Sequence, residues 1–271
     1  MLDIAGLRVS YGERAVLRGV DLNVGAGEVV GLVGPNGCGK TTLIRAITRV
    51  LQWDSGEVRL DGVSASVLSR TELARRVAVV PQSPALPVGY TGLDVALMGR
   101  TPHLSFLDQE GPEDYETARE ALRRLDVIEL ADRRVDELSG GERQNIVLAR
   151  ALAQDTAVLL LDEPTANLDI GHQITVARLA QELAREKGIA VLAAMHDLTL
   201  AALHCDRLAL MAEGVIFAEG APRDVLTAEN IRQAYGVHVL VLNEPSLPAP
   251  VVVPYADGVG ANAAARSERR S

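Results

Sequence analysis

Residues 34–41 read Gly-Pro-Asn-Gly-Cys-Gly-Lys-Thr, and they follow the apolar run Val29-Val30-Gly31-Leu32-Val33. The octapeptide is a complete G-x-x-x-x-G-K-[ST] pattern, in which free backbone amides at a helix start meet phosphate oxygens. Its glycines let the backbone approach phosphate without a Cβ in the way. Apolar residues then recur at helical spacing from Leu43 to Leu51. The segment therefore predicts a strand, a phosphate loop and a helix that begins near Lys40.

Two side chains of this loop have specific expected roles. Lys40 is expected to bridge the β- and γ-phosphates of a nucleotide, and the Thr41 hydroxyl to ligate magnesium. The other nucleotide contacts expected from the loop and the first helical turn are Gly34, Pro35, Asn36, Gly37, Cys38, Gly39 and Thr42. The phosphate loop requires only a small side chain at Cys38. The two cysteines of the chain, Cys38 and Cys205, are too few for a disulfide framework or a zinc site.

A second apolar run ends in two carboxylates. Val158-Leu159-Leu160-Leu161 leads into Asp162 and Glu163, and ligands of open α/β sheets bind at the carboxyl ends of the strands. We expect Asp162 to hold magnesium, directly or through water, and Glu163 to orient the water that attacks the γ-phosphate. A pair of acidic residues that caps the next helix is the structural alternative, and the phosphate loop upstream favours catalysis.

Residues 138–144 read Leu-Ser-Gly-Gly-Glu-Arg-Gln and precede a predicted helix. The start of this helix offers the Ser139 hydroxyl, the amides of Gly140 and Gly141 and the helix dipole to an anion. A simple serine N-cap is the alternative interpretation of the same residues.

Together, the phosphate loop, residues 138–144 and the Asp162–Glu163 pair resemble the ATP-binding cassette (ABC) family, over nearly the whole chain. The resemblance implies that Ser139 and Gly141 contact the γ-phosphate of ATP bound to a second copy, so that two copies enclose two ATP molecules. It also assigns roles to four other positions: adenine stacking to Tyr11, magnesium sensing to Gln82, contact across the dimer to Asp169 and contact with the γ-phosphate to His196.

The order of patterns along the chain predicts an α/β fold. Short apolar runs alternate with helical patterns, which is typical of a parallel sheet wrapped by helices. The resemblance implies a phosphate-loop NTPase (RecA-like) core with an N-terminal antiparallel β-subdomain and an inserted α-helical subdomain. The expected nucleotide-binding domain spans residues 1–255, divided into a core (1–82 and 139–240), a helical insertion (83–138) and a short C-terminal extension (241–255). Residues 256–271 lack periodicity and are predicted to be disordered.

Segments outside these motifs favour one branch of the family. Residues 98–104, 167–173, 226–231 and 235–237 are similar to the ATPases of iron–siderophore, haem and cobalamin importers. Two residues depart from the family pattern. Asn145 stands where Arg is usual, and Gly92 stands where a β-branched residue is usual, so a looser start of the insertion helix is expected.

The amino-acid composition limits the kinds of partner that the chain is expected to bind. A formal net charge of −9 argues against nucleic acid, which selects basic faces. The chain has no apolar run long enough for a membrane helix and no secretion signal at its start. We therefore expect a peripheral protein on the cytoplasmic face of the inner membrane, bound to transmembrane permease subunits and served indirectly by a substrate-binding protein. The alternatives are the ATPase of another ABC transporter, or a non-transport ABC protein that acts on nucleic acid or the ribosome.

Overall fold

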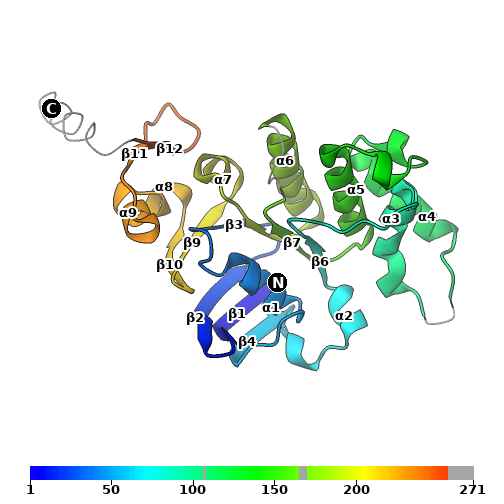
Figure 1. Cartoon of the computed structure of the whole chain (residues 1–271), viewed down its shortest axis with the longest axis horizontal. Coiled ribbons are helices and arrows are strands. Elements are labelled where there is room, and N and C mark those ends of the chain that lie inside the picture. The colour runs from blue at the N-terminus through cyan, green and yellow to red at the C-terminus, as the bar shows by residue number, and fades with distance from the viewer. Residues whose placement is uncertain (106–107, 165–169, 256–271) are drawn as a thin grey trace, which may run out of the picture.

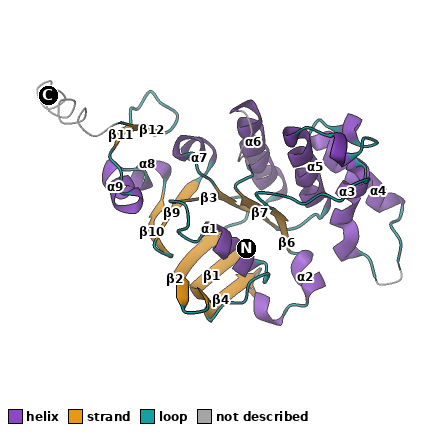
Figure 2. Ribbon diagram, in the orientation of Figure 1, coloured by secondary structure: helices purple, strands orange, loops and turns teal. Residues whose placement is uncertain are grey.

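The apolar runs of the sequence form one central sheet of six strands (Figures 1 and 2). The computed structural model describes residues 1–105, 108–164 and 170–255. The strands are β3 (Val29–Val33), β6 (Val77–Val80), β7 (Val158–Asp162), β8 (Ala190–Ala194), β9 (Arg207–Ala212) and β10 (Val215–Gly220). Their order is β10-β9-β3-β8-β7-β6. All neighbours are parallel except β10 and β9. The predicted α/β class with a parallel sheet is confirmed.

The inner strands of this sheet are covered on both faces. Every residue of β3, β7 and β8 is buried, as expected for parallel strands between two layers. Because side chains alternate along a strand, Leu160 packs into one core and its neighbours Leu159 and Leu161 pack into another. The sheet thus divides the interior into two hydrophobic cores.

The first of these cores lies between the central sheet and an N-terminal antiparallel sheet, with α1 (Lys40–Ile47) contributing apolar side chains. The strands of the N-terminal sheet are β1 (Leu2–Tyr11), β2 (Arg14–Val24), β4 (Ser55–Leu60) and β5 (Val63–Ser64), in the order β2-β1-β4-β5. Buried and exposed residues alternate along β1 and β2, because only one face of each packs on the core. The second core lies under α6 (Ile170–Lys187) and α7 (Leu198–His204), above the sheet in Figure 1.

A third core belongs to the helical part of the chain. It joins the helices α3 (Gly92–Leu97), α4 (Pro112–Arg124) and α5 (Gly140–Ala153) and the 3₁₀ segments η2 (Met98–His103), η3 (Ile128–Leu130) and η4 (Val135–Glu137). One side of α5 contributes Ile146 and Ala149 to this core, and the other contributes Val147 and Leu148 to the second core, which lies under α6 and α7. A single helix therefore ties the two parts together.

The expected loose start of the insertion helix is wrong. Thr91 caps α3 in a reciprocal pair of hydrogen bonds with Asp94, and the Gly92 N–H donates to the Arg133 carbonyl at 3.0 Å. A Cβ at Gly92 would lie 2.4 Å from the Leu130 carbonyl oxygen. Glycine is required here because the backbones approach too closely for any side chain.

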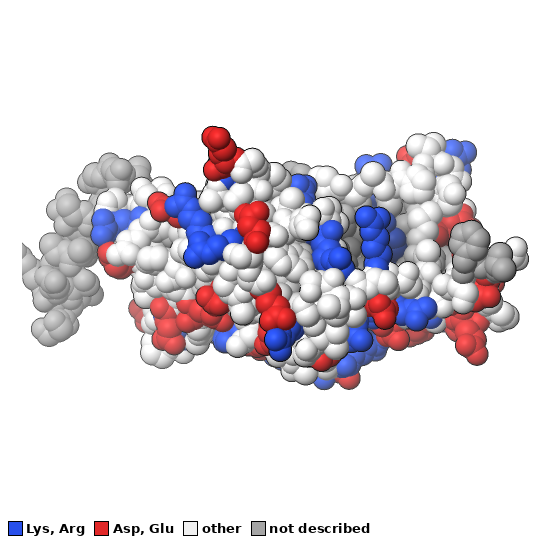
Figure 3. Space-filling model, turned by 90° about the horizontal axis from the view of Figure 1, so that it is seen from below, with Lys and Arg blue, Asp and Glu red and all other residues white. Residues whose placement is uncertain are grey.

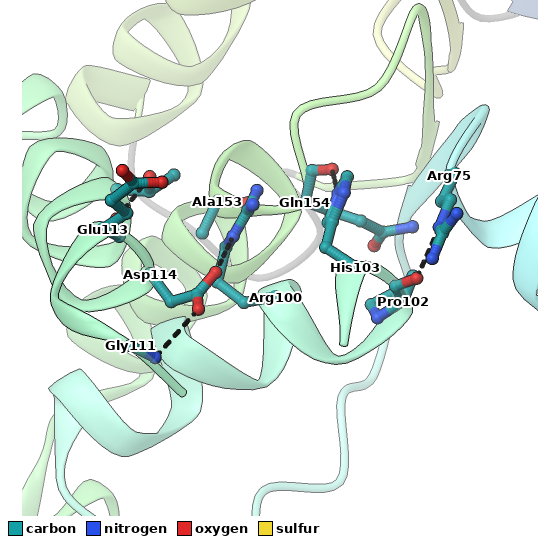
Figure 4. A network of polar contacts seen from close by, with 10 residues as sticks. Arg75, Arg100, Pro102, His103, Gly111, Glu113, Asp114, Ala153 and Gln154 are labelled. Atoms are coloured by element: carbon teal, nitrogen blue, oxygen red, sulfur yellow. Dashed lines mark hydrogen bonds and ion pairs between the residues drawn. The ribbon is translucent and has the colours of Figure 1, made fainter. Parts of the chain in front are cut away.

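A polar network fixes the same region to the core (Figure 4). Arg100 of η2 donates to Asp114 of α4 and to the Ala153 carbonyl at the end of α5, both at 2.9 Å. His103 lies 2.9 Å from the Gln154 carbonyl oxygen. Arg75 directly follows α2 (Arg70–Ala74). Its Nε donates a hydrogen bond of 2.6 Å to the Pro102 carbonyl. Residues 98–103 thus connect the helical part to the core through hydrogen bonds.

The C-terminal region adds a short layer beside the edge of the central sheet. It contains α8 (Pro222–Val225), α9 (Ala228–Tyr235) and a two-stranded antiparallel sheet of β11 (Val239–Leu242) and β12 (Val251–Pro254). The predicted disordered tail, residues 256–271, lies outside the described residues. Of the helices in the described ranges, none combines the length and apolarity needed to cross a membrane.

Candidate nucleotide-binding site

The phosphate loop connects the end of β3 to α1, as its sequence predicts. Gly34 and Gly39 have φ values of 154° and 120°, which L-residues rarely adopt. A Cβ at Gly34 would lie 2.1 Å from the Met211 carbonyl oxygen of β9. The loop is therefore built around glycine both for its backbone angles and for its contact with the neighbouring strand. Asn36 and Gly37 are exposed at the tip of the loop, whereas Cys38 is buried beneath it.

Lys40 is the first residue of α1, and only 4% of its surface is exposed. Its ammonium donates to the Gly34 carbonyl at 2.8 Å and to the Pro35 carbonyl at 3.4 Å. It also lies 3.9 Å from Glu163 Oε1. A buried lysine needs such partners, since an uncompensated buried charge is strongly disfavoured. The side chain is thus held across the mouth of the loop, with Thr42 half-buried in the first turn behind it.

Glu163 is the point at which distant residues meet. It directly follows β7, is 8% exposed and has a positive φ of 51°, unusual for a residue with a side chain. Its N–H donates to the Ala194 carbonyl of β8 at 3.1 Å. Glu163 Oε2 accepts a hydrogen bond from Gln82 Nε2 at 2.5 Å and lies 2.6 Å from His196 Nε2. Lys40, Gln82 and His196 come from three separate elements and converge on this one carboxylate.

Asp162 lies beside the loop, one residue earlier. Its Oδ1 accepts a hydrogen bond of 3.0 Å from the Thr41 hydroxyl. Burial raises the pKa of Asp162, and the Thr41 hydrogen bond opposes this shift. A carboxylate and a hydroxyl are hard oxygen donors, which suits Mg²⁺ with its preference for one or two protein ligands plus phosphate oxygens. The residues present therefore fit the expected magnesium site.

Ser139 forms its hydrogen bonds within the first turn of α5, in the same chain. Ser139 caps α5: its hydroxyl accepts from the Glu142 N–H at 3.3 Å, and its own N–H donates to Glu142 Oε2 at 2.7 Å. Ser139 and Gly140 are exposed. In the described part of the chain, no hydrogen bond joins residues 139–144 to the phosphate loop. The N-cap interpretation is thus observed, and the anion-binding interpretation stays a prediction, since an N-cap can also present its amides to an external anion.

Tyr11 lies at the end of β1 and is 46% exposed. A cavity of about 620 Å³ at the loop is lined by Glu13, Arg14, Gly37 and Cys38 among other residues, and Arg14 pairs with Tyr11 across β1 and β2. The expected dimer contact Asp169 lies outside the described residues.

Some of these relationships have no signal in the amino-acid sequence. The family resemblance predicts a contact of Gln82 with magnesium and of His196 with phosphate. Their contacts with Glu163 depend on which strands are neighbours in the sheet, and local sequence does not specify that order. Met211 and Leu17, which pack against the loop glycines, carry only an apolar pattern.

A parallel sheet with a glycine-rich loop between β3 and α1, and acidic residues at the end of a neighbouring strand, defines a phosphate-loop nucleotide-binding protein. Residues 17–166 match the family model described as ABC transporter. The chain belongs to the ABC transporter family.

Two relatives and one solved structure show how far the similarity extends. The ferric enterobactin transport ATP-binding protein FepC of Escherichia coli is 39% identical over 248 residues, which are 92% of each chain. The cobalamin import ATP-binding protein BtuD of Halobacterium salinarum is 42% identical over 97% of this chain, which spans 65% of that relative's length. A transporter described as of the metal-chelate type, in an inward-facing conformation, has 27% identity and a TM-score of 0.81 over 94% of this chain and 98% of the other.

Proposed function

We propose that this protein is the ATP-binding and ATP-hydrolysing subunit of an ABC importer, and that it drives uptake of a metal chelate such as an iron–siderophore, haem or cobalamin. The observation that carries the proposal is the convergence of Lys40, Gln82 and His196 on Glu163 beside the phosphate loop. The relatives that transport ferric enterobactin and import cobalamin support the class of cargo.

The chemistry requires positioning and charge neutralisation rather than covalent catalysis. Lys40 turns from the carbonyls of the loop towards the β- and γ-phosphates, and Glu163 orients the attacking water. His196, which follows β8 and lies 2.6 Å from Glu163 Oε2, is expected to contact the γ-phosphate. When bound between Thr41 and Asp162, magnesium neutralises charge on the phosphates.

The nucleotide base has a site on the other side of the loop. The exposed side chain of Tyr11 offers a stacking face for adenine, and the cavity of about 620 Å³ lined by Gly37 and Cys38 provides room at the loop.

A second copy of the chain completes the phosphate site. Ser139, Gly140 and Gly141 lie at an exposed helix start, with no hydrogen bond to the loop of their own chain within the described residues. The Ser139 hydroxyl and the amides of Gly140 and Gly141 are therefore expected to meet the γ-phosphate of an ATP molecule bound to the other copy. Two copies in this arrangement enclose two ATP molecules, with Asp169 at the interface.

The permease subunits bind on the face that joins the core to the helical part. A groove of about 770 Å³ separates these parts, with Arg49 and Arg70 on the core side and Met98 and Arg150 on the helical side. Figure 3 shows basic side chains on either side of the hollow on this face. A subunit that occupies this groove contacts both parts, so that closure of the dimer is transmitted to it. In this proposal the protein acts peripherally on the cytoplasmic face of the membrane, and a substrate-binding protein delivers the cargo to the permease.

The test uses purified full-length chain with Mg²⁺ and ATP. Glu163→Gln is expected to bind ATP as the wild type does, to lose nearly all turnover and to accumulate as an ATP-bound dimer in size-exclusion chromatography. Lys40→Ala is expected to weaken ATP binding itself, because the buried ammonium is lost. Glu129→Gln changes an exposed glutamate and serves as the matched control. An active Glu163→Gln enzyme, or one that stays monomeric with ATP, would contradict the proposal.

A further inference from the structure

The charged side chains in the groove between the core and the helical part are all positive. The groove has a volume of about 770 Å³, and its lining includes three arginines, Arg49, Arg70 and Arg150. None of the other described residues that line it is acidic. Apolar side chains such as Leu73 and Val77 make up much of the remaining lining. The groove thus combines an apolar surface with positive charge, in a chain whose formal net charge is −9.

Arg150 lies in the last turn of α5 and is half-buried. Its guanidinium makes no hydrogen bond or ion pair with any residue that the structure describes, and burial lowers its pKa with no carboxylate of that part of the chain to oppose the shift. The carbonyls at the end of α5 have other partners, since Arg100 donates to Ala153 and His103 lies 2.9 Å from the Gln154 carbonyl oxygen (Figure 4). A half-buried charge without a counter-ion costs free energy. Arg150 is therefore in need of an anionic partner.

Arginines just outside the groove have such partners. Arg100 lies 2.9 Å from Asp114, and Arg76 lies 3.8 Å from Asp61. Arg70, the first residue of α2, is exposed and forms no ion pair within the described ranges. The carboxylates of this region are thus used elsewhere, and the positive charge of the groove is left for a ligand from outside the chain.

The size and position of the groove limit what this ligand can be. Clefts of about 300–1,000 Å³ hold small ligands, so only a short segment of a protein partner can enter. The lining comes from α2 and β6 of the core and from η2 and α5 of the helical part. It shares no residue with the lining of the cavity at the phosphate loop, so bound nucleotide leaves the groove open. An apolar segment that carries a carboxylate matches both the surface and the charge.

We propose that the groove receives a short amphipathic segment of the permease subunit, and that a carboxylate of this segment pairs with Arg150, with the exposed Arg70 as a second contact. The inference rests on the proposed function and adds the chemistry by which the permease is recognised. A guanidinium and a carboxylate can form two parallel hydrogen bonds, which fixes the orientation of the bound segment. Arg150 also lies on the helix whose start, about three turns away, is expected to meet ATP of the other copy. The permease contact therefore acts directly on that helix.

The test uses the full-length chain and the permease subunits encoded beside it, purified in detergent, with the Kd between them measured by biolayer interferometry. Arg150→Gln should raise this Kd about tenfold or more, because the carboxylate of the permease is left buried without its partner. Arg150→Lys keeps the charge without the planar fork, so it should recover part of the affinity. Arg70→Gln should raise the Kd less than about fivefold, since an exposed pair contributes little.

Arg185→Gln is the matched control, because Arg185 is an exposed arginine of α6 that does not line the groove. It should leave the Kd for the permease unchanged. ATP affinity, ATP hydrolysis and the melting temperature of isolated Arg150→Gln should equal those of the wild type, because Arg150 touches neither the nucleotide site nor a partner within the described chain. The permease carboxylate is then located by charge exchange: Arg150→Glu should lose binding, and replacing the correct carboxylate by arginine should restore it.

Three results overturn the inference and leave the proposed function standing. The first is a wild-type Kd for the permease in Arg150→Gln. The second is a loss of affinity accompanied by a lower melting temperature of the isolated variant, which would make Arg150 a residue required for folding. The third is binding of the wild type, but not of Arg150→Gln, to vesicles of phosphatidylglycerol without permease, which would assign the groove to a lipid headgroup. If the wild-type chain binds no permease at all, the proposed function itself fails.

Discussion

Replacing Gly92 by alanine tests whether the helical part is held by the close approach of two backbones. The new Cβ would lie 2.4 Å from the Leu130 carbonyl oxygen and 3.0 Å from Ile146 Cδ1. Ile146 can adopt another rotamer, whereas the Leu130 carbonyl can move only if the backbone shifts. Backbone hydrogen bonds from Gly92 to Arg133 and from Leu93 to Ala131, of 3.0 and 2.9 Å, join the two segments at this point.

Two opposing contributions set the change in the unfolding free energy of Gly92→Ala. Overpacking in a filled interior costs about 1–3 kcal/mol, and replacing glycine by alanine in a compatible conformation gains about 0.4–1 kcal/mol. The net loss of unfolding free energy is therefore about 1–2 kcal/mol. At about 2 °C per kcal/mol for a domain of this size, the melting temperature falls by about 2–4 °C.

The assay is urea denaturation followed by circular dichroism, with thermal melting as a second measurement. Gly140→Ala is a closely matched control, because Gly140 also begins a helix behind a capping box and a Cβ there has nothing within 4 Å. This variant should be as stable as the wild type or slightly more stable. Equal stabilities of Gly92→Ala and Gly140→Ala would refute the reasoning.

Two further predictions concern carboxyl groups whose pKa values are shifted, Asp162 and Asp114. Burial raises the pKa of Asp162, so its ionised form destabilises the nucleotide-free fold as pH rises through the range between the unfolded and folded pKa. Asp162→Asn should therefore melt higher than wild type at pH 7 without nucleotide and lose the Mg²⁺-dependent gain in ATP affinity; a lower melting temperature would contradict this. The Arg100 hydrogen bond lowers the pKa of Asp114, helped by the Gly111 N–H, so its stabilisation is complete above the unfolded pKa and lost as pH falls through the folded one. Asp114→Asn and Arg100→Gln should both flatten the acid side of a plot of melting temperature against pH, and an unchanged acid side would exclude the contact as a source of stability.

The alternation of strand and helix patterns was sufficient to predict the α/β class, and the motifs were sufficient for the ABC family; both predictions are confirmed. The start of α1 at Lys40 and the end of β7 at Asp162 follow from local sequence. The Gly92 expectation failed because family usage at one position does not reveal that another backbone lies against it. The site assignments of the sequence stay predictions, although the structure places Lys40, Gln82 and His196 around Glu163.

The local chemistry follows from the order of amino acids alone: a glycine loop that exposes amides, a carboxylate pair after a buried strand and a capped helix start with two glycines. These features depend on neighbours along the chain, so spacing is enough to define them. Which of these features meet in space depends on how the chain folds. Strands β3, β7 and β8 are adjacent because hydrophobic burial and hydrogen bonding select one strand order from many. That order brings Glu163 to Lys40 and His196.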